Sequence, residues 1–345
     1  MTPKDEKKGE PGRLRRLLGP TSQGAQWIAL AAAAAIIGLI VENILSNAGV
    51  FRAETPPSQP TATVETPSAP GEPTSLPPSP TTEPSPTATP APIVTPTLPP
   101  TETASDGAEM ILIESGPFEM GSPDGPFNEK PVHTVFLDAF YLDKYEVTNR
   151  QYAECVEAGV CTPPQGIASA RRELYFGNEA FDDYPVIFVS WFQAKAYCAV
   201  WRGDDLPTEA QWEKAARWEP DTGISRRYPW GEEPPSVDLL NYHAEDVIND
   251  TTPVEAFEAG ASPVGAQNML GNVWEWVQDW YSDEYYYFSP DTNPPGPPEE
   301  IRPGLRAVRG GSWAYKQIPR ATDRQDAEQT LVENDIGFRC ARNVE

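Results

Sequence analysis

The sequence is poor in the side chains that most enzymes use for metal and nucleophilic chemistry. Its 345 residues include two histidines and four cysteines. A nonheme-iron site typically needs two histidines and a carboxylate. His133 follows a strand-like Pro-Val pair and His243 lies in a turn-rich loop, so we expect each to be an ordinary polar residue. The sequence also lacks a glycine-rich phosphate loop and a Ser-His-Asp arrangement with supporting context.

Positive charge is scarce as well. The chain has 26 Lys and Arg against 51 Asp and Glu, and residues 109–345 alone have 19 against 41, a balance of −22. Such a field repels phosphate backbones, so nucleic acid is not an expected partner. An acidic surface suits hard cations such as calcium, although it also serves solubility alone.

One long hydrophobic run stands near the N-terminus, after a basic head of residues 1–24. Residues 27–41 are unbroken apolar, and a helix over residues 25–45 would be about 31 Å long, enough to cross a bilayer. The basic flank keeps the N-terminus in the cytoplasm, so the remainder is exported. A signal peptide cleaved near residues 46–48 is the alternative, but the long head favours an uncleaved transmembrane signal anchor at residues 25–46.

Residues 47–108 are predicted to be a disordered linker. Most of this stretch is Pro, Thr, Ser, Ala and Glu, and residues 53–107 contain no aromatic side chain. Such a composition cannot bury enough surface to fold, and its prolines favour extended polyproline II. We interpret it as a spacer between the membrane and one globular domain at residues 109–345, which is long enough for a single core.

The globular part mixes strand and helix signals. Residues 110–113 and 118–120 are predicted as paired strands around a turn at residues 115–117, and residues 132–142 alternate like a strand. Beyond Trp218 the chain is rich in turns and aromatic residues and shows little periodicity. The predicted fold class is therefore α+β with little regular secondary structure.

Three helices are indicated by N-terminal caps. Thr148 opens a helix that runs to Gly159. Ser190 precedes a predicted helix over residues 191–201, which stops near Gly203, and Thr208 precedes one over residues 209–218. Both of these caps have a glutamine three residues later, the pattern of a capping box.

Residues 268–280 have an unusual composition. Two asparagines, a glycine, a glutamate and three tryptophans lie within thirteen residues. Tryptophans bury large areas, whereas asparagine and glycine favour tight turns. The stretch is expected to form irregular core backbone that needs further stabilisation.

Several ordered motifs resemble those of the formylglycine-generating enzyme family, also called the sulfatase-modifying factor domain. They cover essentially all of residues 109–342 and include Phe118-Glu-Met-Gly-Ser122, Glu146-Val-Thr-Asn149, Leu206-Pro-Thr-Glu209, Gly271-Asn-Val-Trp-Glu-Trp276, Arg309-Gly-Gly-Ser-Trp313 and Gly337-Phe-Arg-Cys-Ala341. The resemblance implies a single compact domain with a variant of the C-type lectin fold. That fold also serves ergothioneine-synthesis enzymes, pyoverdine-maturation proteins and non-catalytic display proteins.

The resemblance also implies two structural calcium sites. Their positions match Asn268, Gly271, Val273 and Glu275 at the first site, and Asn241, Tyr242, Asp246 and Ile248 at the second. Each set combines side-chain oxygens with backbone carbonyls, which calcium accepts readily. The alternative is that the Asn and Asp residues only stabilise turns.

The four cysteines are expected to form two disulfides. Cys198 and Cys340 match a disulfide of the family, while Cys155 and Cys161 bracket a short loop and are expected to pair locally. An even number of cysteines in an exported domain supports this expectation. Four free thiols would instead need a reducing compartment.

The resemblance fails at the reactive centre. In the family, two cysteines five residues apart bind copper(I), for which soft thiolates are selective, and oxidise a substrate cysteine to formylglycine. Lys316 or a neighbour stands at the first of these positions and Arg320 at the second. Cys155 and Cys161 lie in another part of the sequence. We therefore expect no copper and no residue with the family's catalytic role.

A substrate cleft is expected to persist without the reactive pair. By analogy it is lined by Trp274, Trp313, Tyr315, Arg320, Arg324 and Gln325. Trp, Tyr and Arg dominate binding hot spots, although the tryptophans are equally interpretable as core and the arginines as solvated or paired with acids. The sequence thus predicts an extracytoplasmic binding or assembly module for an unknown peptide or small molecule. An oxidase or a maturation enzyme on the same scaffold is the alternative.

Overall fold

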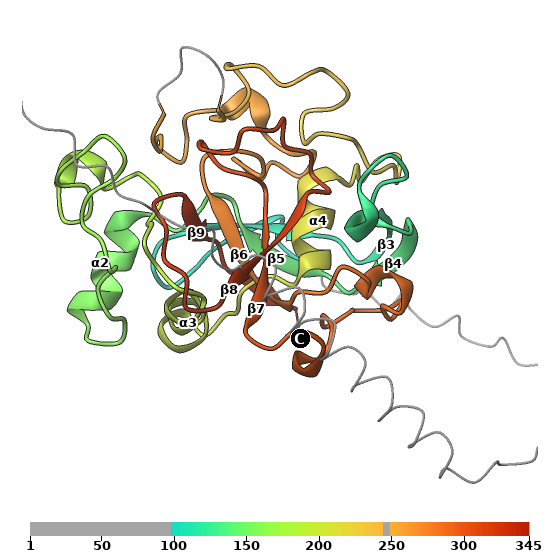
Figure 1. Cartoon of the computed structure of the whole chain (residues 1–345), viewed down its shortest axis with the longest axis horizontal. Coiled ribbons are helices and arrows are strands. Elements are labelled where there is room, and N and C mark those ends of the chain that lie inside the picture. The colour runs from blue at the N-terminus through green and yellow to red at the C-terminus, as the bar shows by residue number, and fades with distance from the viewer. Residues whose placement is uncertain (1–97, 244–248, 345) are drawn as a thin grey trace, which may run out of the picture. The chain divides into compact units, whose positions relative to one another are not determined.

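A computed structural model describes residues 98–243 and 249–344 (Figure 1). The predicted head, anchor and linker up to residue 97 lie outside the described residues. Within the described ranges, no helix combines the length and the apolar character that crossing a membrane requires.

The domain is built from many short elements. Its strands are β1 (Thr101–Thr103), β2 (Glu109–Ile113), β3 (Gly116–Met120), β4 (His133–Leu137), β5 (Phe140–Asp143), β6 (Trp274–Trp280), β7 (Leu305–Arg309), β8 (Arg324–Glu328), β9 (Ile336–Phe338) and β10 (Ala341–Asn343). Its α-helices are α2 (Asn149–Glu157), α3 (Trp191–Lys195) and α4 (Glu209–Arg217). Shorter turns of helix are η1 (Phe127–Glu129), η2 (Glu179–Phe181), η4 (Glu258–Gly260), η5 (Tyr285–Tyr287) and η6 (Glu299–Ile301), and η3 (Ala196–Arg202) is a π-helix that continues α3.

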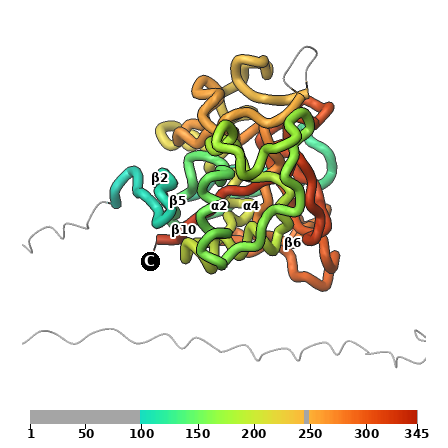
Figure 2. Tube along the Cα trace, turned by 90° about the vertical axis from the view of Figure 1, so that its left-hand side faces the viewer, coloured from blue at the N-terminus to red at the C-terminus, as the bar shows by residue number. Residues whose placement is uncertain are grey.

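The strands form two four-stranded sheets and one two-stranded sheet. The first sheet has the order β1-β2-β5-β10 and the second has the order β8-β7-β6-β9. Figure 2 shows β2, β5 and β10 side by side, so the first and last strands of the domain share one sheet. In Figure 1 the second sheet lies at the centre of the domain, and α3 and α4 pack against β6.

The predicted pairing of the first two strands of the globular part is wrong. β2 pairs with β1 and β5, whereas β3 pairs with β4. The predicted strand at residues 132–142 is in fact two strands, β4 and β5, which belong to different sheets. The predicted turn at residues 115–117 is also wrong, because β3 begins at Gly116 and only residues 114–115 separate it from β2. The chain passes between two sheets there, so β2 and β3 satisfy their backbone groups with different partners.

The predicted helix starts are confirmed. Thr148, Ser190 and Thr208 each accept a hydrogen bond from the backbone N–H three residues on. The glutamine side chain at that position in turn accepts one from the backbone N–H of the cap residue. The chain leaves η3 through Gly203, whose φ of 77° is the left-handed conformation that glycine favours. These caps fix where the three helices enter the core.

β6 runs between two apolar clusters and connects them. Trp274 and Trp276 belong to one cluster, together with residues of α3 and η3, whereas Val277 belongs to the other, together with Trp212 of α4. The approach to β6 is irregular, with positive φ at Asn268, Gly271 and Asn272, so the expectation of irregular core backbone is confirmed there.

Both expected disulfides are present. Cys155 pairs with Cys161 and Cys198 pairs with Cys340, which accounts for all four cysteines of the sequence. The second bridge ties η3 to the C-terminal part of the chain across 142 residues. Loops of that length give the larger chain-entropy stabilisation.

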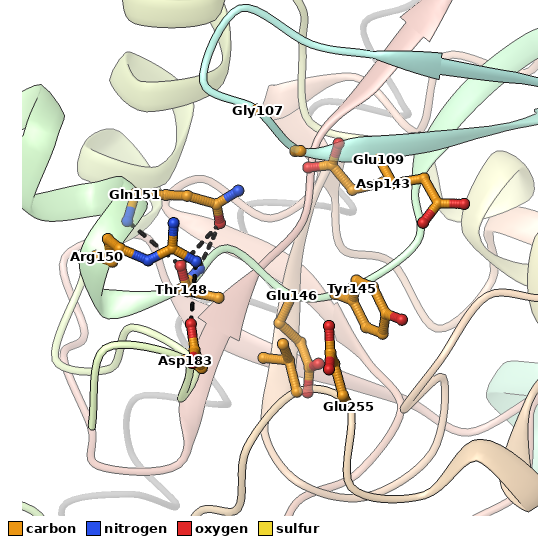
Figure 3. A pocket seen from close by; sticks show the side chains of 12 residues that line it. Gly107, Glu109, Asp143, Tyr145, Glu146, Thr148, Arg150, Gln151, Asp183 and Glu255 are labelled. Atoms are coloured by element: carbon orange, nitrogen blue, oxygen red, sulfur yellow. Dashed lines mark hydrogen bonds and ion pairs between the residues drawn. The ribbon is translucent and has the colours of Figure 1, made fainter. Parts of the chain in front are cut away.

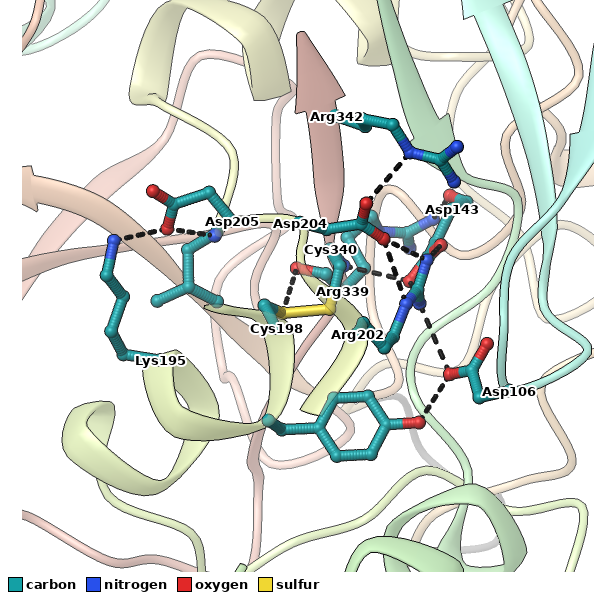
Figure 4. The surroundings of a disulfide bond; sticks show 12 residues. Asp106, Asp143, Lys195, Cys198, Arg202, Asp204, Asp205, Arg339, Cys340 and Arg342 are labelled. Carbon is teal, nitrogen blue, oxygen red and sulfur yellow. Dashed lines mark hydrogen bonds and ion pairs between the residues drawn. A yellow bond between two sulfur atoms is a disulfide. The ribbon is translucent and has the colours of Figure 1, made fainter. Parts of the chain in front are cut away.

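Ordered structure begins before the predicted boundary at residue 109. β1 pairs with β2, and Asp106 accepts a hydrogen bond from Tyr197 and forms an ion pair with Arg202. Figure 4 shows Arg202 beside the Cys198–Cys340 bridge, among Asp106, Asp143 and Asp204. The linker-like composition of residues 47–108 did not indicate the contact of Asp106 with Arg202, because the contact depends on a buried arginine far away in the sequence.

Candidate functional site

The segment after the Gly-Gly-Ser motif, which the resemblance matches to the copper position, contains no thiol. Tyr315 and Arg320 have the five-residue spacing of the missing cysteines, and Lys316 is exposed beside Tyr315. Because every cysteine of the chain is in a disulfide, no free thiolate is available to take over this role. Thiolate-copper chemistry thus has no ligands here.

Arg320 is held in place by two carboxylates. Its Nη2 donates to Asp323 Oδ1 at 2.6 Å and also to Glu129 Oε1, and its backbone N–H donates to Asp323 Oδ2 at 2.9 Å. The Glu129 side chain is 1% exposed and that of Arg320 is 20% exposed. Burial raises the pKa of Glu129, while Arg320 opposes this rise. A positive charge is thus fixed at the position that the resemblance matches to a copper ligand.

Tyr315 links three of the predicted cleft residues. Its ring packs edge-to-face on Trp274 with 5.0 Å between ring centroids, and its hydroxyl lies near the side chain of Gln325 on β8. Burial and then the nearby Asp323 raise the pKa of Tyr315, so its hydroxyl stays protonated at neutral pH. Trp274, Tyr315, Gln325 and Arg320 therefore lie in one neighbourhood.

The two tryptophans of the predicted cleft are largely buried. Trp274 is 7% exposed and Trp313 is 9% exposed. The indole Nε1 of Trp313 donates to the carbonyl oxygen of Asn334 at 3.3 Å. Their burial agrees with the interpretation of both as core residues.

The expectation that Arg324 lines the cleft is wrong. Its guanidinium is fully buried and donates to both carboxylate oxygens of Glu209, at 2.7 and 2.6 Å. Arg309 donates to Glu209 at 2.9 Å and to Glu213 at 2.8 Å in the same cluster. These buried acids need two buried cations, and this requirement draws Arg324 into the core.

A pocket of about 350 Å³ opens next to Arg320. Its lining mixes charges and hydroxyls and consists of Ser122, Pro123, Asp124, Arg217, Ser225, Arg227, Glu232, Arg320 and Thr322. Arg217 is already bonded to Glu213 and to backbone carbonyls, whereas Arg227 is exposed. The pocket thus offers charged side chains and hydroxyl groups to a polar ligand such as a peptide segment.

A second pocket, of about 240 Å³, is strongly acidic. Figure 3 shows its lining, in which the carboxylates are Glu109, Asp143, Glu146, Asp183 and Glu255. Asp143 is paired with Arg202, Asp183 with Arg150 and Glu109 with Lys144. Glu146 is buried and accepts hydrogen bonds from two neutral amides, and burial raises its pKa to about 7. This lining favours cations over anions.

The first predicted calcium site adjoins Glu146. Asn268 donates through Nδ2 to Glu146 at 3.0 Å and to the Val254 carbonyl at 2.8 Å, which leaves its Oδ1 for another contact. Glu275 accepts two hydrogen bonds from Arg339 and one from Trp212. A carboxylate has about four lone-pair sites, so one remains. Together with the carbonyls of Gly271 and Val273, this set of oxygens fits the chemistry of calcium.

The second predicted calcium site is described only in part. Asn241 donates to the Asp250 carbonyl at 2.8 Å and lies against Asn272, and Tyr242 follows it. Asp246 and Ile248 lie outside the described residues. Across residues 98–243 and 249–344 no group of three or more His, Cys, Asp or Glu side chains forms a metal centre. Calcium would thus depend chiefly on amide and carbonyl oxygens, with the Glu275 carboxylate as a further ligand at the first site.

Sequence reasoning missed Glu129, Asp323 and Glu146 as members of these sites. Asp323 lies three residues from Arg320, a spacing that suggests a local pair, but Glu129 is 191 residues away and gave no signal. Glu146 stands inside one of the recognised motifs, where its charge could have indicated a polar site.

Comparison with known proteins agrees with these motifs. A family model described as "Sulfatase-modifying factor enzyme 1-like domain" matches residues 95–344. The formylglycine-generating enzyme of Streptomyces coelicolor is 31% identical over 295 residues, covering 68% of this chain and 90% of that protein. Serine/threonine-protein kinase Pkn1 of Chlamydia trachomatis is 36% identical over 250 residues, covering 68% of this chain but 38% of the relative's length.

The fold has solved counterparts as well. The structure of PvdO from Pseudomonas aeruginosa superposes with a TM-score of 0.59 at 26% identity, and the match covers 72% of this chain and 100% of that one. The region that the family model matches, residues 95–344, coincides with the described domain and contains every recognised motif. This chain therefore belongs to the family of sulfatase-modifying factor enzyme 1-like domains.

Proposed function

We propose that this chain is a membrane-anchored, extracytoplasmic member of the family that binds a ligand or assembles with a partner and does not generate formylglycine. The observation that carries the proposal is the ion pair of Arg320 with Glu129 and Asp323 at the copper position. A guanidinium fixed by two carboxylates cannot coordinate copper(I). The chain has no free thiol that could do so instead, because all four cysteines are in disulfides.

The ligand would bind at the surface formed by Tyr315, Gln325 and Arg320 and at the adjoining pocket. Tyr315 offers an aromatic face and a protonated hydroxyl, and Arg320 offers the N–H groups that Glu129 and Asp323 leave free. Aromatic and arginine side chains held rigidly lose little entropy on binding. A polar peptide or small molecule fits these groups better than an apolar one.

The test is an oxidation assay on the full chain. We expect the protein, loaded with copper(I), to leave the cysteine of a sulfatase peptide unmodified, as read by mass spectrometry. The Streptomyces coelicolor enzyme serves as the positive control in the same assay. Copper-dependent formation of formylglycine by this chain would contradict the proposal.

An enzyme of another kind on the same scaffold is the second candidate. It is favoured by the relatives, since one is named a formylglycine-generating enzyme and PvdO matches over its whole length. Metal analysis of the purified full chain separates the two. Stoichiometric iron or copper supports an enzyme, whereas calcium alone supports a binding module.

The anchor is tested separately from the binding function. The basic head and the apolar run at residues 25–46 support membrane attachment with the domain outside the cytoplasm. We expect the chain to stay in the membrane fraction after carbonate extraction and its domain to be digested when protease is added outside intact cells. Release by carbonate would point to a cleaved signal peptide.

A structural role for calcium belongs to the same proposal. Asn268, Gly271, Val273 and Glu275 would hold one ion, and Asn241, Tyr242, Asp246 and Ile248 a second. Support comes from the Oδ1 of Asn268, which has no hydrogen bond to the described residues, and from the remaining lone-pair site of Glu275. Bound calcium would supply positive charge and hold the irregular backbone before β6.

A further inference from the structure

A third pocket lies at the N-terminal end of α4 and differs in chemistry from the others. Its volume is about 290 Å³. Four primary amides converge on it from four parts of the chain: Gln211 from the first turn of α4, Gln278 from β6, Asn343 from β10, and Asn293 from the loop between η5 and η6. Such convergence from distant segments makes a preformed site.

The lining of this pocket is almost free of charge. Asp138 is its single ionisable side chain. The amide of Asn293 makes two hydrogen bonds with Asp138: Nδ2 donates to Asp138 Oδ2 at 2.7 Å, and Oδ1 accepts from the Asp138 backbone N–H at 3.0 Å. The surrounding domain is rich in acidic residues, but Asp138 is the one acid in the pocket lining, and no basic residue lines it. An anion finds no counter-charge here, and a cation finds one carboxylate that is already bonded.

Two of the amides are held in fixed orientations. Gln211 Oε1 accepts from the Thr208 backbone N–H at 2.9 Å as part of the capping box of α4. Its Nε2 donates to Asn343 Oδ1 at 2.8 Å, so the amino group of Asn343 points away from Gln211. The backbone carbonyl of Gln278 accepts a hydrogen bond from Arg306. Within the described residues, the Asn343 amino group and the Gln278 side-chain oxygen Oε1 make no hydrogen bond. They are a donor and an acceptor for a ligand.

Apolar surface completes the pocket. Pro294 and Pro295 form one wall, and Leu137 and Val344 contribute to another. A sugar ring or a cyclic polyol combines hydroxyls, which both donate and accept, with apolar C–H faces. Planar amides match the hydroxyls and the prolines match the C–H faces. The volume is close to the lower end of the usual range of about 300–1,000 Å³, which suits a single ring.

We propose that this pocket binds one neutral polyhydroxylated ring, a sugar unit or a cyclic polyol. The site is separate from the surface beside Arg320, because Gln211 lies in the first turn of α4 whereas Arg217 of its last turn lines the other pocket. The inference goes beyond the proposed function, and the absence of oxidase activity does not bear on it.

The test measures binding of simple rings to the full chain, kept soluble in a detergent without a sugar headgroup. The probes are D-glucose, N-acetyl-D-glucosamine and myo-inositol, with D-glucosamine and D-glucuronate as charged counterparts, read by saturation-transfer NMR and titration calorimetry. We expect saturable binding of at least one neutral ring and weaker binding of its charged counterpart. Failure of every neutral ring to bind, or equal binding of charged rings, would overturn the proposal.

Asn343→Asp is the decisive variant. Its carboxylate still accepts from Gln211, so the capping box of α4 is kept, but it removes the two amino-group donors and adds a charge. We expect loss of ring binding with an unchanged unfolding temperature. Gln165→Glu makes the same change in charge at an exposed amide outside the pocket and should bind as the wild type does.

If Asn343→Asp lowers the unfolding temperature, Gln278→Ala tests the acceptor side of the pocket instead. Its side-chain contact to Asp205 is long, at 3.4 Å, so truncation removes little internal bonding. Wild-type affinity in either folded variant contradicts the proposed site. Such a result would leave the oxidation assay and its interpretation untouched.

Discussion

Arg320 and Glu129 form an ion pair between the loop that follows β7 and the short helix η1, which are 191 residues apart in sequence. Glu129 is buried and Arg320 is its cationic partner, while Asp323 bonds to the same guanidinium nitrogen. The pair therefore holds the surface where the family's reactive cysteines are replaced.

Removing the cation from this pair should destabilise the domain. Arg320→Met leaves Glu129 without its ion-pair partner, and breaking a buried pair costs about 3–5 kcal/mol. Because Arg320 is one-fifth exposed, we expect a loss toward the lower end of that range in urea unfolding. Lys316→Met, an exposed cation in the same loop, should change stability little. Adding Glu129→Gln to Arg320→Met should recover part of the loss, and no recovery would show that Glu129 is not the cause.

A second prediction concerns the backbone before β6. Gly271 has φ +79°, and a Cβ there would lie 2.3 Å from the carbonyl oxygen of Asn241. Gly107 has nearly the same φ, +82°, but no atom within 4 Å of the equivalent position. Both Gly→Ala variants have the same backbone strain, of about 1–2 kcal/mol. Thermal unfolding should show a clearly larger loss for Gly271→Ala, and equal losses would contradict the close approach.

Local signals predicted the parts of the fold that depend on neighbours in sequence. The capping boxes at Ser190 and Thr208 involve residues three positions apart, so the helices and their starts could be predicted. The strand partners could not, because β3 and β4 pair across an intervening loop and β5 pairs with β10 at the far end of the chain. Alternation of apolar residues identifies a strand but not its neighbour.

Only the part of the candidate site that follows from the family resemblance could be predicted from the sequence. The missing cysteines and the contact of Tyr315 with Trp274 could be expected, but the roles of Arg320 and Arg324 differ for a reason outside their local sequence. Arg324 is the first residue of β8 and its side chain points into the core, where Glu209 needs a counter-charge. Arg320 reaches from a partly exposed position to the buried carboxylates of Glu129 and Asp323.

The buried Asp279 predicts a dependence of stability on pH. Burial, and then the charge of Glu209, raise the pKa of Asp279 to about 8 from 3.8, while Arg324 and Arg309 oppose the rise. The folded state thus holds a proton that the unfolded state releases above about pH 4. This contribution to the free energy of unfolding is present below the unfolded pKa and is lost as pH rises toward 8.

Asp279→Asn should remove that contribution. The amide oxygen still accepts from the Glu209 backbone N–H, as Asp279 Oδ2 does at 2.9 Å. Relative to the wild type, the variant should gain stability as pH rises from 4 to 8, by up to about 1.4 kcal/mol for each pKa unit of difference. Urea unfolding at a series of pH values measures this gain. Asp326→Asn, at an exposed carboxylate on β8, should give a curve parallel to the wild type.

The calcium proposal predicts that calcium raises the unfolding temperature. Variants of two nearby asparagines, Asn268 and Asn272, can test whether that increase depends on the proposed ligand. Asn268 and Asn272 both have positive φ and both donate to Glu146, at 3.0 and 2.9 Å, but only Asn268 is a predicted ligand. Alanine at either position should lower the unfolding temperature, because it strains the backbone and removes one hydrogen bond to a buried carboxylate.

The measurement is the difference in unfolding temperature with calcium and with a chelator. A ligand at a hundred times its dissociation constant stabilises a protein by about 2.7 kcal/mol. We expect that difference in the wild type and in Asn272→Ala, and a smaller one in Asn268→Ala, which retains only the second proposed site. Magnesium should not replace calcium, because it needs near-ideal octahedral geometry and gives up its waters reluctantly. If neither calcium nor chelator changes the unfolding temperature of the wild type, the calcium proposal is contradicted. Hydrogen bonds alone, chiefly those of Glu146, Glu275 and Arg339, would then hold this backbone.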